Sequence, residues 1–279
     1  MEVVKVSVLQ WDVHFGDLNY NRQRSLELIE IAVEQGAEIV LMPELCISGY
    51  AFESKEEAFK LSEPVGGVTE QLWHEIANKY DIIIAGGIAE RGETDLYNSL
   101  VVIGAEGEIA RYRKTHLFDK EKLFFVQGEE FVTFDAKNIK VGLMVCYDGW
   151  FPEVPRALVL EGAELILASG CWIGDPAPDR ELSIITMHLG HAYTNSVYIA
   201  CAVRTGEERG LHYTGQSVLL SPYGILGEPA SSDSDMVLTA PMYPRYARQK
   251  RYTELAHPIE DRRPELYEKL MERPKKNLP

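Results

Sequence analysis

The stretch that decides the fold is VGLMVCYDGWFPE, which occupies residues 141–153. It opens with an uninterrupted apolar run that has valine at both ends, which is typical of a buried strand. Cys146 follows the run directly, and Pro152, a residue type favoured in the first turn of a helix, comes shortly after. The sequence therefore predicts a strand-to-helix elbow that carries a thiol, where the first helix amides would lower the pKa of the thiol and stabilise an oxyanion. An unreactive buried cysteine fits the same letters, because free cysteine is among the most buried residue types.

The elbow stands in the second of two similar halves of the chain. The related heptapeptides QGAEIVL and EGAELIL, at residues 35–41 and 161–167, hold the same place in each half. In the first half we expect strands at residues 5–10, 37–42 and 81–89, helices at 19–35 and 69–80, and a hairpin at 97–103 and 108–114. In the second half we expect strands at residues 139–145, 164–168 and 197–203, helices at 152–161 and 180–195, and a hairpin at 216–221 and 224–228.

Each half predicts a small sheet that carries two helices on one face. Two such halves bury their bare sheet faces best by stacking them, so the predicted fold is α/β, a four-layer α-β-β-α sandwich built from two similar halves. We expect residues 1–279 to form a single domain that ends in a charged, proline- and arginine-rich arm at about residues 243–279. Such an arm would lie on the surface or on a partner subunit, and a disordered tail is the alternative.

The composition excludes several classes of protein. A net charge of −15 argues against binding to the phosphate backbone of a nucleic acid. The chain shows neither a signal peptide nor an apolar run near the roughly eighteen residues that a membrane helix needs, so we expect a cytoplasmic protein without a membrane partner. The four cysteines lack Cys-x-x-Cys spacing, which argues against disulfides and against a zinc site.

Three polar residues stand at the ends of predicted strands. Glu44 closes the second strand of the first half, Lys114 closes its hairpin, and Cys146 closes the first strand of the second half. Together they suit acyl transfer: the carboxylate takes the thiol proton, the sulfur attacks a carbonyl or nitrile carbon, and the ammonium neutralises the developing charge. Taken alone, each residue also fits an ordinary structural role in a turn, in solvent or in the core. The prediction of an acyl-transfer site rests on the occurrence of all three residues at strand ends.

The segments around these residues resemble a known family. MPELCISGY at residues 42–50, YRKTHL at 112–117 and VCYDGWFPE at 145–153 resemble the three signatures of the nitrilase, or carbon–nitrogen hydrolase, superfamily. The resemblance runs in order over the chain to about residue 228. It implies the same sandwich, a Glu-Lys-Cys triad that needs no cofactor and no metal, and assembly through a two-fold contact into a homodimer or a larger even-numbered homo-oligomer.

The resemblance also implies roles for individual residues. Cys146 would be the nucleophile, Glu44 the general base and Lys114 the stabiliser of the oxyanion, with the backbone N–H of Tyr147 completing the oxyanion hole. Glu121, in EKLFFVQG at residues 121–128, would hold Lys114 and orient the substrate; the alternative is a surface charge at a helix end.

Further residues are expected to shape the pocket and the elbow. The expected pocket wall consists of Tyr50, Trp150, Cys171, Trp172 and, less directly, Tyr193, with core packing as the alternative for each aromatic ring. Asp148, Glu153 and Arg156 are expected to form buried polar pairs that shape the elbow.

The late helix departs from the family pattern. Relatives commonly have Arg-Ala-x-Glu-Asn where this chain has HAYTN at residues 191–195. The missing arginine and glutamate weaken the prediction of the subunit interface. We expect His191, and likewise His116, to have structural roles.

Four substrate classes fit this chemistry: amides, carbamoyl compounds, nitriles and glutamine-like amide donors. In the family, Cys-Tyr-Asp at residues 146–148 favours amide hydrolysis, so we rank amides first, N-carbamoyl amines second and nitriles third. An inactive binding module is a further alternative, although every catalytic residue is present. A redox sensor would need a resolving cysteine, and the sequence places none adjacent to Cys146.

Overall fold

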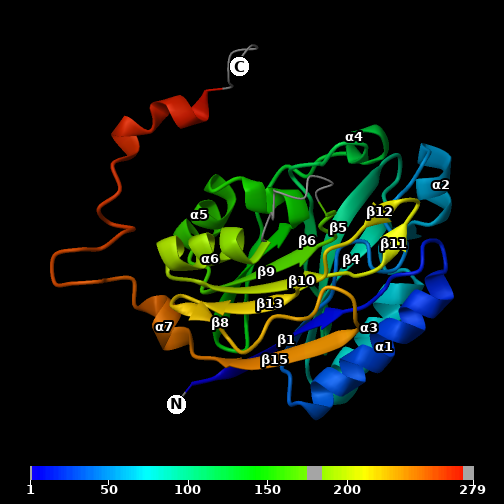
Figure 1. Cartoon of the computed structure of the whole chain (residues 1–279), viewed down its shortest axis with the longest axis horizontal. Coiled ribbons are helices and arrows are strands. Elements are labelled where there is room, and N and C mark those ends of the chain that lie inside the picture. Colours follow the sequence, from blue (N-terminus) through cyan, green and yellow to red (C-terminus); the bar gives the residue numbers. More distant parts are fainter. Residues whose placement is uncertain (1, 175–183, 273–279) are drawn as a thin grey trace.

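The protein is described here by a computed structural model that covers residues 2–174 and 184–272. It has a mixed α/β fold in which two sheets face each other and helices cover their outer faces (Figure 1). The strand order is β15-β1-β2-β4-β5-β6 in the first sheet, with β3 beside β4, and β14-β13-β10-β9-β8-β7 in the second. Strands β11 and β12 form a separate short ribbon.

The element bounds follow the predicted order closely. The first sheet contains β1 (Val4–Gln10), β2 (Ile39–Leu41), β3 (Glu63–Pro64), β4 (Ile83–Arg91), β5 (Leu96–Gly104), β6 (Gly107–Arg113) and β15 (Met236–Met242). The second contains β7 (Thr133–Ala136), β8 (Ile139–Val145), β9 (Leu165–Gly170), β10 (Tyr198–Val203), β13 (Val218–Ser221) and β14 (Gly224–Ile225), and the ribbon consists of β11 (Glu207–Glu208) and β12 (Leu211–His212). The helices are α1 (Leu18–Glu34), α2 (Lys55–Lys60), α3 (Val68–Tyr80), α4 (Glu121–Phe124), α5 (Glu153–Leu160), α6 (Ile184–Asn195) and α7 (Pro244–Arg248).

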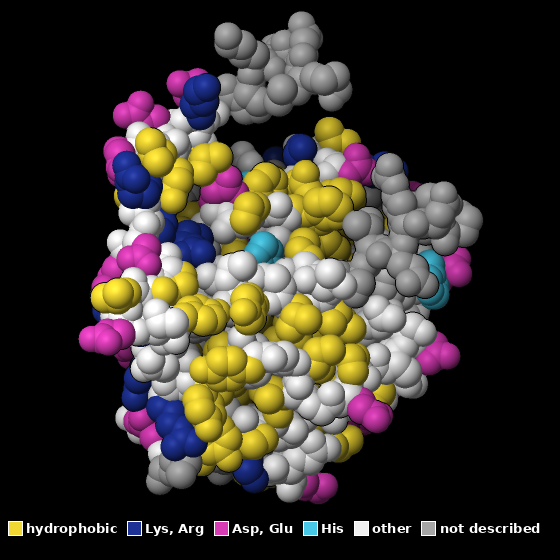
Figure 2. All heavy atoms as spheres, turned by 60° about the vertical axis from the view of Figure 1, so that its left-hand side comes forward, with side chains coloured by type: hydrophobic (Ala, Val, Ile, Leu, Met, Phe, Trp, Pro, Cys, Tyr) yellow, Lys and Arg dark blue, Asp and Glu magenta, His cyan; other side chains and the backbone are white. Residues whose placement is uncertain are grey.

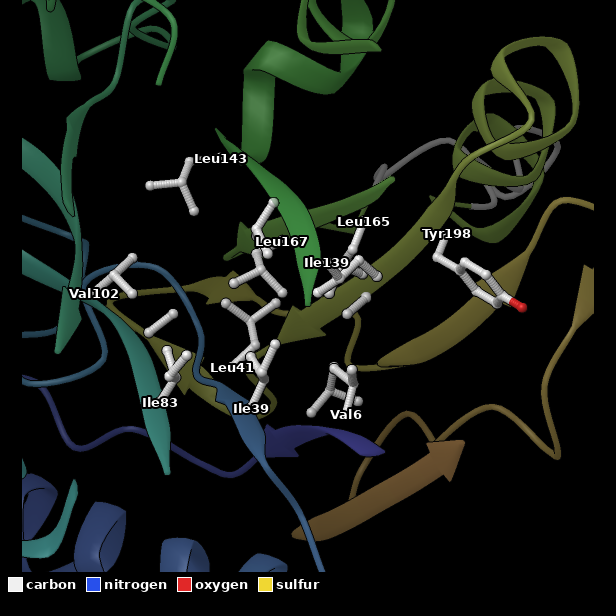
Figure 3. Close-up of a cluster of buried hydrophobic side chains, with 14 of the residues drawn as sticks. Val6, Ile39, Leu41, Ile83, Val102, Ile139, Leu143, Leu165, Leu167 and Tyr198 are labelled. Atoms are coloured by element: carbon white, nitrogen blue, oxygen red, sulfur yellow. The ribbon is translucent and has the colours of Figure 1, made fainter. Parts of the chain in front are cut away.

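The side-chain alternation of the strands produces the layers. On β8, Val141 and Leu143 point into a cluster that also holds Val6 of β1 and Leu41 of β2, so the two sheets share one core (Figure 3). Met144, the residue after Leu143, points to the opposite face of the sheet, into a cluster with residues of α5 and α6. Residues of α1 and α3 pack on the outer face of the first sheet in the same manner. The order of layers is therefore α-β-β-α, as the repeat predicts.

The repeated Gly-Ala-Glu sequence has a structural reason. Gly36 and Gly162 follow the ends of α1 and α5 with φ of +83° and +96°, a conformation that favours glycine. The next residue then bonds back into the helix: the Ala37 N–H donates to the Ala32 carbonyl, and the Ala163 N–H donates to the Leu158 carbonyl. Both halves thus use the same glycine stop to turn a helix into a central parallel strand.

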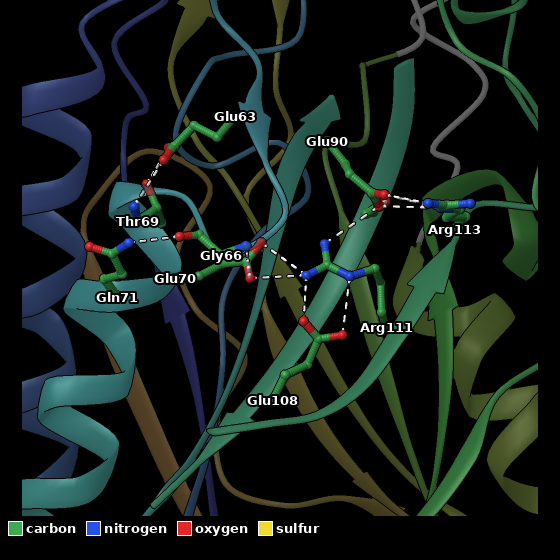
Figure 4. Close-up of polar contacts among 10 residues, drawn as sticks. Glu63, Gly66, Thr69, Glu70, Gln71, Glu90, Glu108, Arg111 and Arg113 are labelled. Carbon is green, nitrogen blue, oxygen red and sulfur yellow. Dashed lines mark hydrogen bonds and ion pairs between the residues drawn. The ribbon is translucent and has the colours of Figure 1, made fainter. Parts of the chain in front are cut away.

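A network of ion pairs fixes the edge of the first sheet. Arg111 of β6 bonds Glu70 of α3 and Glu108, and Arg113 of β6 bonds Glu90 of β4 (Figure 4). Glu90 is fully buried. Strand β6 is therefore held in register directly before Lys114.

Strand β15 was not predicted. It lies antiparallel to β1, with Val4 opposite Met242 and Gln10 opposite Met236, so the chain returns to the first sheet after the second half is complete. The predicted helix at residues 180–195 is described only from Ile184 onward, because residues 175–183 lie outside the described part. Within residues 2–174 and 184–272, no helix has the length and apolar character needed to cross a membrane.

The arm after α7 leaves the body of the molecule. It passes the outer helices of the second sheet and then extends away from them (Figure 1). Two contacts tie its base to the end of α6: Lys250 Nζ lies 2.8 Å from the Ser196 carbonyl oxygen, and the Tyr252 ring meets the Tyr193 ring. Apolar side chains gather on the face beside it (Figure 2).

Candidate active site

Glu44 and Lys114 meet at the edge where their strands end. Glu44 follows β2, Lys114 follows β6, and both side chains are fully buried. Lys114 Nζ lies 2.7 Å from Glu44 Oε1, and Asn98 Nδ2 donates to the same oxygen at 2.6 Å. The Lys114 N–H also donates to the Asn98 carbonyl at 2.8 Å. Asn98 of β5 therefore fixes both partners of this ion pair.

Glu121 lies at the start of α4 and completes the cluster around the ammonium. Its Oε1 lies 2.8 Å from Lys114 Nζ, and its Oε2 accepts the Phe118 N–H at 3.0 Å. The structure places this carboxylate in the interior, so it is not a surface charge. Burial raises the pKa of Glu121 to about 7, although the Lys114 ammonium opposes the rise. Burial also acts to lower the pKa of Lys114, but the carboxylates of Glu121 and Glu44 hold that pKa well above its usual range, so the ammonium stays charged.

Cys146 occupies a tight turn at the end of β8. Its φ of +47° is unusual for a residue with a side chain, and residues Cys146–Trp150 form one turn of 3₁₀-helix. The Cys146 sulfur, a carboxylate oxygen of Glu44 and the sulfur of Cys171 all lie within 4.8 Å of one another. The predicted elbow is present.

The predicted effect on the thiol is wrong. Helix α5 begins only at Glu153, beyond the 3₁₀ turn, and burial raises the pKa of the Cys146 thiol instead of lowering it. The sulfur therefore keeps its proton until a base removes it.

Asp148 ties the turn to the segment that carries Lys114. Its Oδ2 accepts the Val145 N–H and the Tyr112 hydroxyl, both at 2.8 Å, and its Oδ1 accepts the His116 N–H at 3.1 Å. This is the buried polar arrangement expected of Asp148, and His116 has the structural part expected of it. The parallel expectation for Glu153 is wrong, because that side chain is exposed.

Arg156 and His191 lie on the far side of the turn. Arg156 is half-buried and donates to the Thr194 carbonyl at 3.0 Å, so its polar contact among the described residues is with the end of α6 and not with the elbow. His191 Nε2 lies 2.8 Å from the Gly149 carbonyl oxygen, which is the structural role expected of it.

Cys171 has a different environment from the one predicted. It was expected in the pocket wall, but it is almost fully buried and faces the carboxylate of Glu44. Its thiol donates to Glu44 Oε2 at 2.8 Å and its backbone N–H donates to the same oxygen at 3.1 Å. The sequence carries a signal for this placement, because Cys146 and Cys171 each come shortly after a strand. The two strands, β8 and β9, are parallel neighbours with Val145 opposite Ser169, so the residues after both strands meet at one edge of the sheet.

Comparison with known proteins identifies the family of this chain. The family model "Carbon-nitrogen hydrolase" matches residues 5–252. The chain belongs to the carbon–nitrogen hydrolase family. A protein named nitrilase from Pyrococcus abyssi is 38% identical over 95% of this chain and 99% of its own length. An N-carbamoylputrescine amidase from Arabidopsis thaliana is 31% identical over 96% and 95% of the two chains.

The solved structures include amidases of the same fold. The amidase from Nesterenkonia sp. AN1, as a double mutant in complex with acrylamide, superposes with a TM-score of 0.79 over 97% of this chain and 98% of that one, at 23% identity. The protein is thus a carbon–nitrogen hydrolase of the nitrilase superfamily, and the expectation of an enzyme is confirmed.

A buried ion pair behind the pocket of this carbon–nitrogen hydrolase was missed in the sequence. Glu208 Oε2 accepts the N–H groups of Tyr50 and Ala51 at 2.9 and 3.0 Å and the Tyr213 hydroxyl at 3.1 Å. Its other oxygen bonds the guanidinium of Arg204, which is fully buried and lies over the Tyr213 ring. Glu208 therefore fixes the backbone at Tyr50. The sequence carries no local signal for this, because the partners come from distant segments.

The hydrolase has a small pocket next to Glu121. The pocket has a volume of about 180 Å³, and its lining includes Tyr50, Glu121, Phe118, Phe124, Ile173 and Leu211. Burial and the nearby Glu121 carboxylate raise the pKa of the Tyr50 hydroxyl well above its usual range, so this hydroxyl stays protonated as a possible donor.

The aromatic residues predicted for the pocket wall divide into two groups. Tyr50 lines the pocket, whereas Tyr147, Trp150 and Trp172 are not among its lining residues. Tyr147 meets the pocket residue Phe118 edge to face with ring centroids 5.2 Å apart, and Trp150 stacks on Trp172 at 6.3 Å. Tyr193 lies elsewhere, because its ring packs on Tyr252 of the arm.

Proposed function

We propose that this enzyme hydrolyses a small amide to a carboxylic acid and ammonia through a thioester on Cys146. The observation that carries the proposal is the buried carboxylate of Glu44. One of its oxygens bonds the Lys114 ammonium at 2.7 Å, while the carboxylate also lies within 4.8 Å of the Cys146 sulfur. A base, a cation and a nucleophile thus surround one point at which a carbonyl carbon could react.

The first half of the reaction forms the thioester. Glu44 takes the thiol proton as the Cys146 sulfur attacks the amide carbon, and the resulting oxyanion is stabilised by the Lys114 ammonium and the backbone N–H of Tyr147. Glu44 then gives the proton to the leaving nitrogen, and ammonia departs. In the second half, Glu44 takes a proton from water, the hydroxide attacks the thioester carbon, and the proton returns to the sulfur as the acid leaves.

The electrostatics support this sequence of steps. Burial raises the pKa of the Cys146 thiol, so the sulfur is protonated at rest and needs a base at the moment of attack. The Lys114 ammonium stays charged between two carboxylates, so it can face the oxyanion without a proton transfer of its own. Glu121 bonds the ammonium at 2.8 Å and lines the pocket, which suits the orienting role expected of it.

The pocket favours a small acyl group, since a volume of about 180 Å³ suits a short aliphatic or a single aromatic group. Most of its lining is aromatic and aliphatic, and charged side chains complete it: Glu53, Asp119, Lys120, Glu121 and Arg209. N-carbamoyl amines are the second candidate, because relatives named N-carbamoylputrescine amidase align over nearly the whole chain. Nitriles are the third, on the name of the relative from Pyrococcus abyssi.

The decisive experiment measures ammonia release from a panel of short aliphatic and aromatic amides, N-carbamoyl amines and nitriles. We expect the wild type to turn over uncharged amides and Cys146→Ala to be inactive while keeping its circular dichroism spectrum. Cys201→Ala removes a different buried thiol, which packs under α5 and α6, and should keep its activity. Activity of Cys146→Ala above a few per cent would contradict the role of this thiol, and turnover of nitriles alone would contradict the substrate ranking.

A further inference from the structure

Two thiols and one carboxylate face one another in this site. The sulfurs of Cys146 and Cys171 and a carboxylate oxygen of Glu44 lie within 4.8 Å of one another, and each comes from a different strand end. We propose that these three groups chelate a thiophilic divalent cation such as Zn²⁺, and that the bound cation blocks hydrolysis. The inhibition of hydrolysis rests on the proposed function of Cys146, whereas the binding of the cation does not.

The donor set matches the chemistry of such a cation. Two sulfurs and one carboxylate oxygen are the mixed soft and hard ligands that Zn²⁺ accepts, and three protein ligands leave a fourth position for water. Zinc–sulfur bonds of about 2.3 Å and zinc–oxygen bonds of about 2.1 Å place tetrahedral ligand atoms roughly 3.6 to 3.8 Å apart. The Cys171 sulfur now lies 2.8 Å from Glu44 Oε2, and no pair exceeds 4.8 Å. Side-chain rotations that move each donor atom by about 1 Å would therefore bring the three donors to the distances that the cation requires.

The two carboxylate oxygens of Glu44 have different hydrogen-bond partners, and this difference suits the binding of a cation. Oε1 bonds the Lys114 ammonium and Asn98, whereas Oε2 accepts hydrogen bonds from the thiol and the N–H of Cys171. The cation would bind Oε2 and take the place of the Cys171 thiol proton. The Lys114 charge opposes binding, but Glu121 lies 2.8 Å from that charge on its other side. Both thiols lose their protons to solvent, so two thiolates balance the two charges of the cation.

Access and position separate this pair of thiols from the other cysteines. Cys146 as a residue is partly exposed whereas Cys171 is buried, so a cation would approach the pair from the side of Cys146. Cys46 is fully buried and its thiol points to the Gly87 carbonyl, and Cys201 is fully buried in the core under α5 and α6. Residues 146 and 171 lack the spacing of a local zinc motif, so no local pattern in the sequence indicates this site.

The test uses Zn²⁺ and the spectroscopic probe Co²⁺ on the full chain, without oxidant. We expect one Co²⁺ per chain with sulfur-to-cobalt charge-transfer absorption, displaced by Zn²⁺, and a loss of activity that a chelator reverses. Cys171→Ser preserves the size of the side chain and a donor to Glu44 but replaces sulfur with a harder oxygen. This substitution should weaken Co²⁺ binding by at least about ten-fold, because the loss of a group that only hydrogen-bonds to a metal ligand already costs about that much in metal affinity. Cys171→Ala should weaken binding at least as much, and Cys201→Ala, the matched control, should bind as the wild type does.

Each outcome decides the proposal. Loss of charge-transfer absorption and of inhibition in both Cys171 variants, with both kept in Cys201→Ala, supports it. Undiminished binding in the Cys171 variants, or no Co²⁺ signal in the wild type, overturns it. Inhibition that only a reducing agent reverses would show oxidation of the thiols and would also overturn it. If the wild type binds Co²⁺ as expected yet releases no ammonia from any substrate, the proposed function fails and the cation site stands.

Discussion

Glu208 accepts the backbone N–H of Tyr50 at 2.9 Å and joins two residues that lie 158 positions apart in the chain. The same oxygen accepts the Ala51 N–H, while the other is bonded to Arg204. This single carboxylate therefore connects the loop that carries Tyr50, in the first half, to the β11–β12 ribbon of the second half. Because Tyr50 lines the pocket beside Glu121, a change at Glu208 should reach the pocket without touching the triad.

Glu208→Ala should destabilise the protein strongly. Arg204 is fully buried, and removal of one partner of a buried ion pair costs about 3–5 kcal/mol because it leaves an unpaired charge in the interior. Urea unfolding measures this as a drop in the free energy of unfolding. Glu208→Gln keeps an acceptor for the Tyr50 N–H and should lose less stability while raising KM. An alanine variant as stable as the wild type would show that the pair does not hold the loop.

Lys114→Ala should lower kcat by about 10²–10³-fold, the usual cost of losing one group that stabilises an oxyanion. The reason is that the ammonium is needed as negative charge develops, not when substrate binds. Steady-state kinetics on the best amide of the panel separates the two parameters. Lys122→Ala is a suitable control, because Lys122 follows Glu121 on α4 but its side chain is exposed. A change in KM alone would argue that Lys114 only binds the substrate.

The raised pKa of Glu121 predicts a pH-dependent stability. In the folded protein this pKa is about 7, against 4.5 for an ordinary glutamate, so between these values the folded state holds a proton that the unfolded state releases. The free energy of unfolding should therefore fall as the pH rises from about 4.5 to about 7. Glu121→Gln removes the titrating group, so urea unfolding across the same window should show a shallower fall. Parallel curves for the two proteins would mean that Glu121 does not titrate there.

Most of the fold follows from local patterns in the sequence. The apolar run of β8 and the glycine stops at Gly36 and Gly162 are local features, and they predict buried strands that follow helices. Strand β15 has no comparable signal, because its partner β1 lies at the other end of the chain and only two of its seven residues, Ala240 and Met242, are buried. Pairing at such a distance depends on the assembled sheet and not on neighbouring residues.

The site was partly predictable for a similar reason. Glu44, Lys114 and Cys146 were predicted to meet because each stands at the end of a recognisable strand, and Glu44 does lie close to both of the others. Cys171 also follows a strand, but its contact with Glu44 depends on how the two sheets stack, which the sequence does not specify. The raised pKa of Cys146 is a further case, since burial is a property of the assembled site.

The arm predicts an oligomer. Its side chains Leu255, Leu266, Leu270 and Met271 are between 64% and 89% exposed, an unusual display of large apolar groups for a single chain. The arm that carries them extends away from the body of the molecule (Figure 1). A second copy of the chain would cover them, so we expect an even-numbered homo-oligomer.

Light scattering coupled to size exclusion tests this expectation on the full chain and on a chain that stops at Thr253. That truncation keeps the contacts of Lys250 and Tyr252 with α6 but removes the exposed apolar residues. We expect the truncated chain to form a smaller species or to dissociate at higher concentrations than the full chain. Replacement of Leu255, Leu266 and Leu270 by serine in the full chain should act in the same direction, since it removes apolar area without shortening the arm. A full-length protein that is purely monomeric would contradict the assembly, and identical masses for all three proteins would show that the exposed apolar residues of the arm do not form the contact.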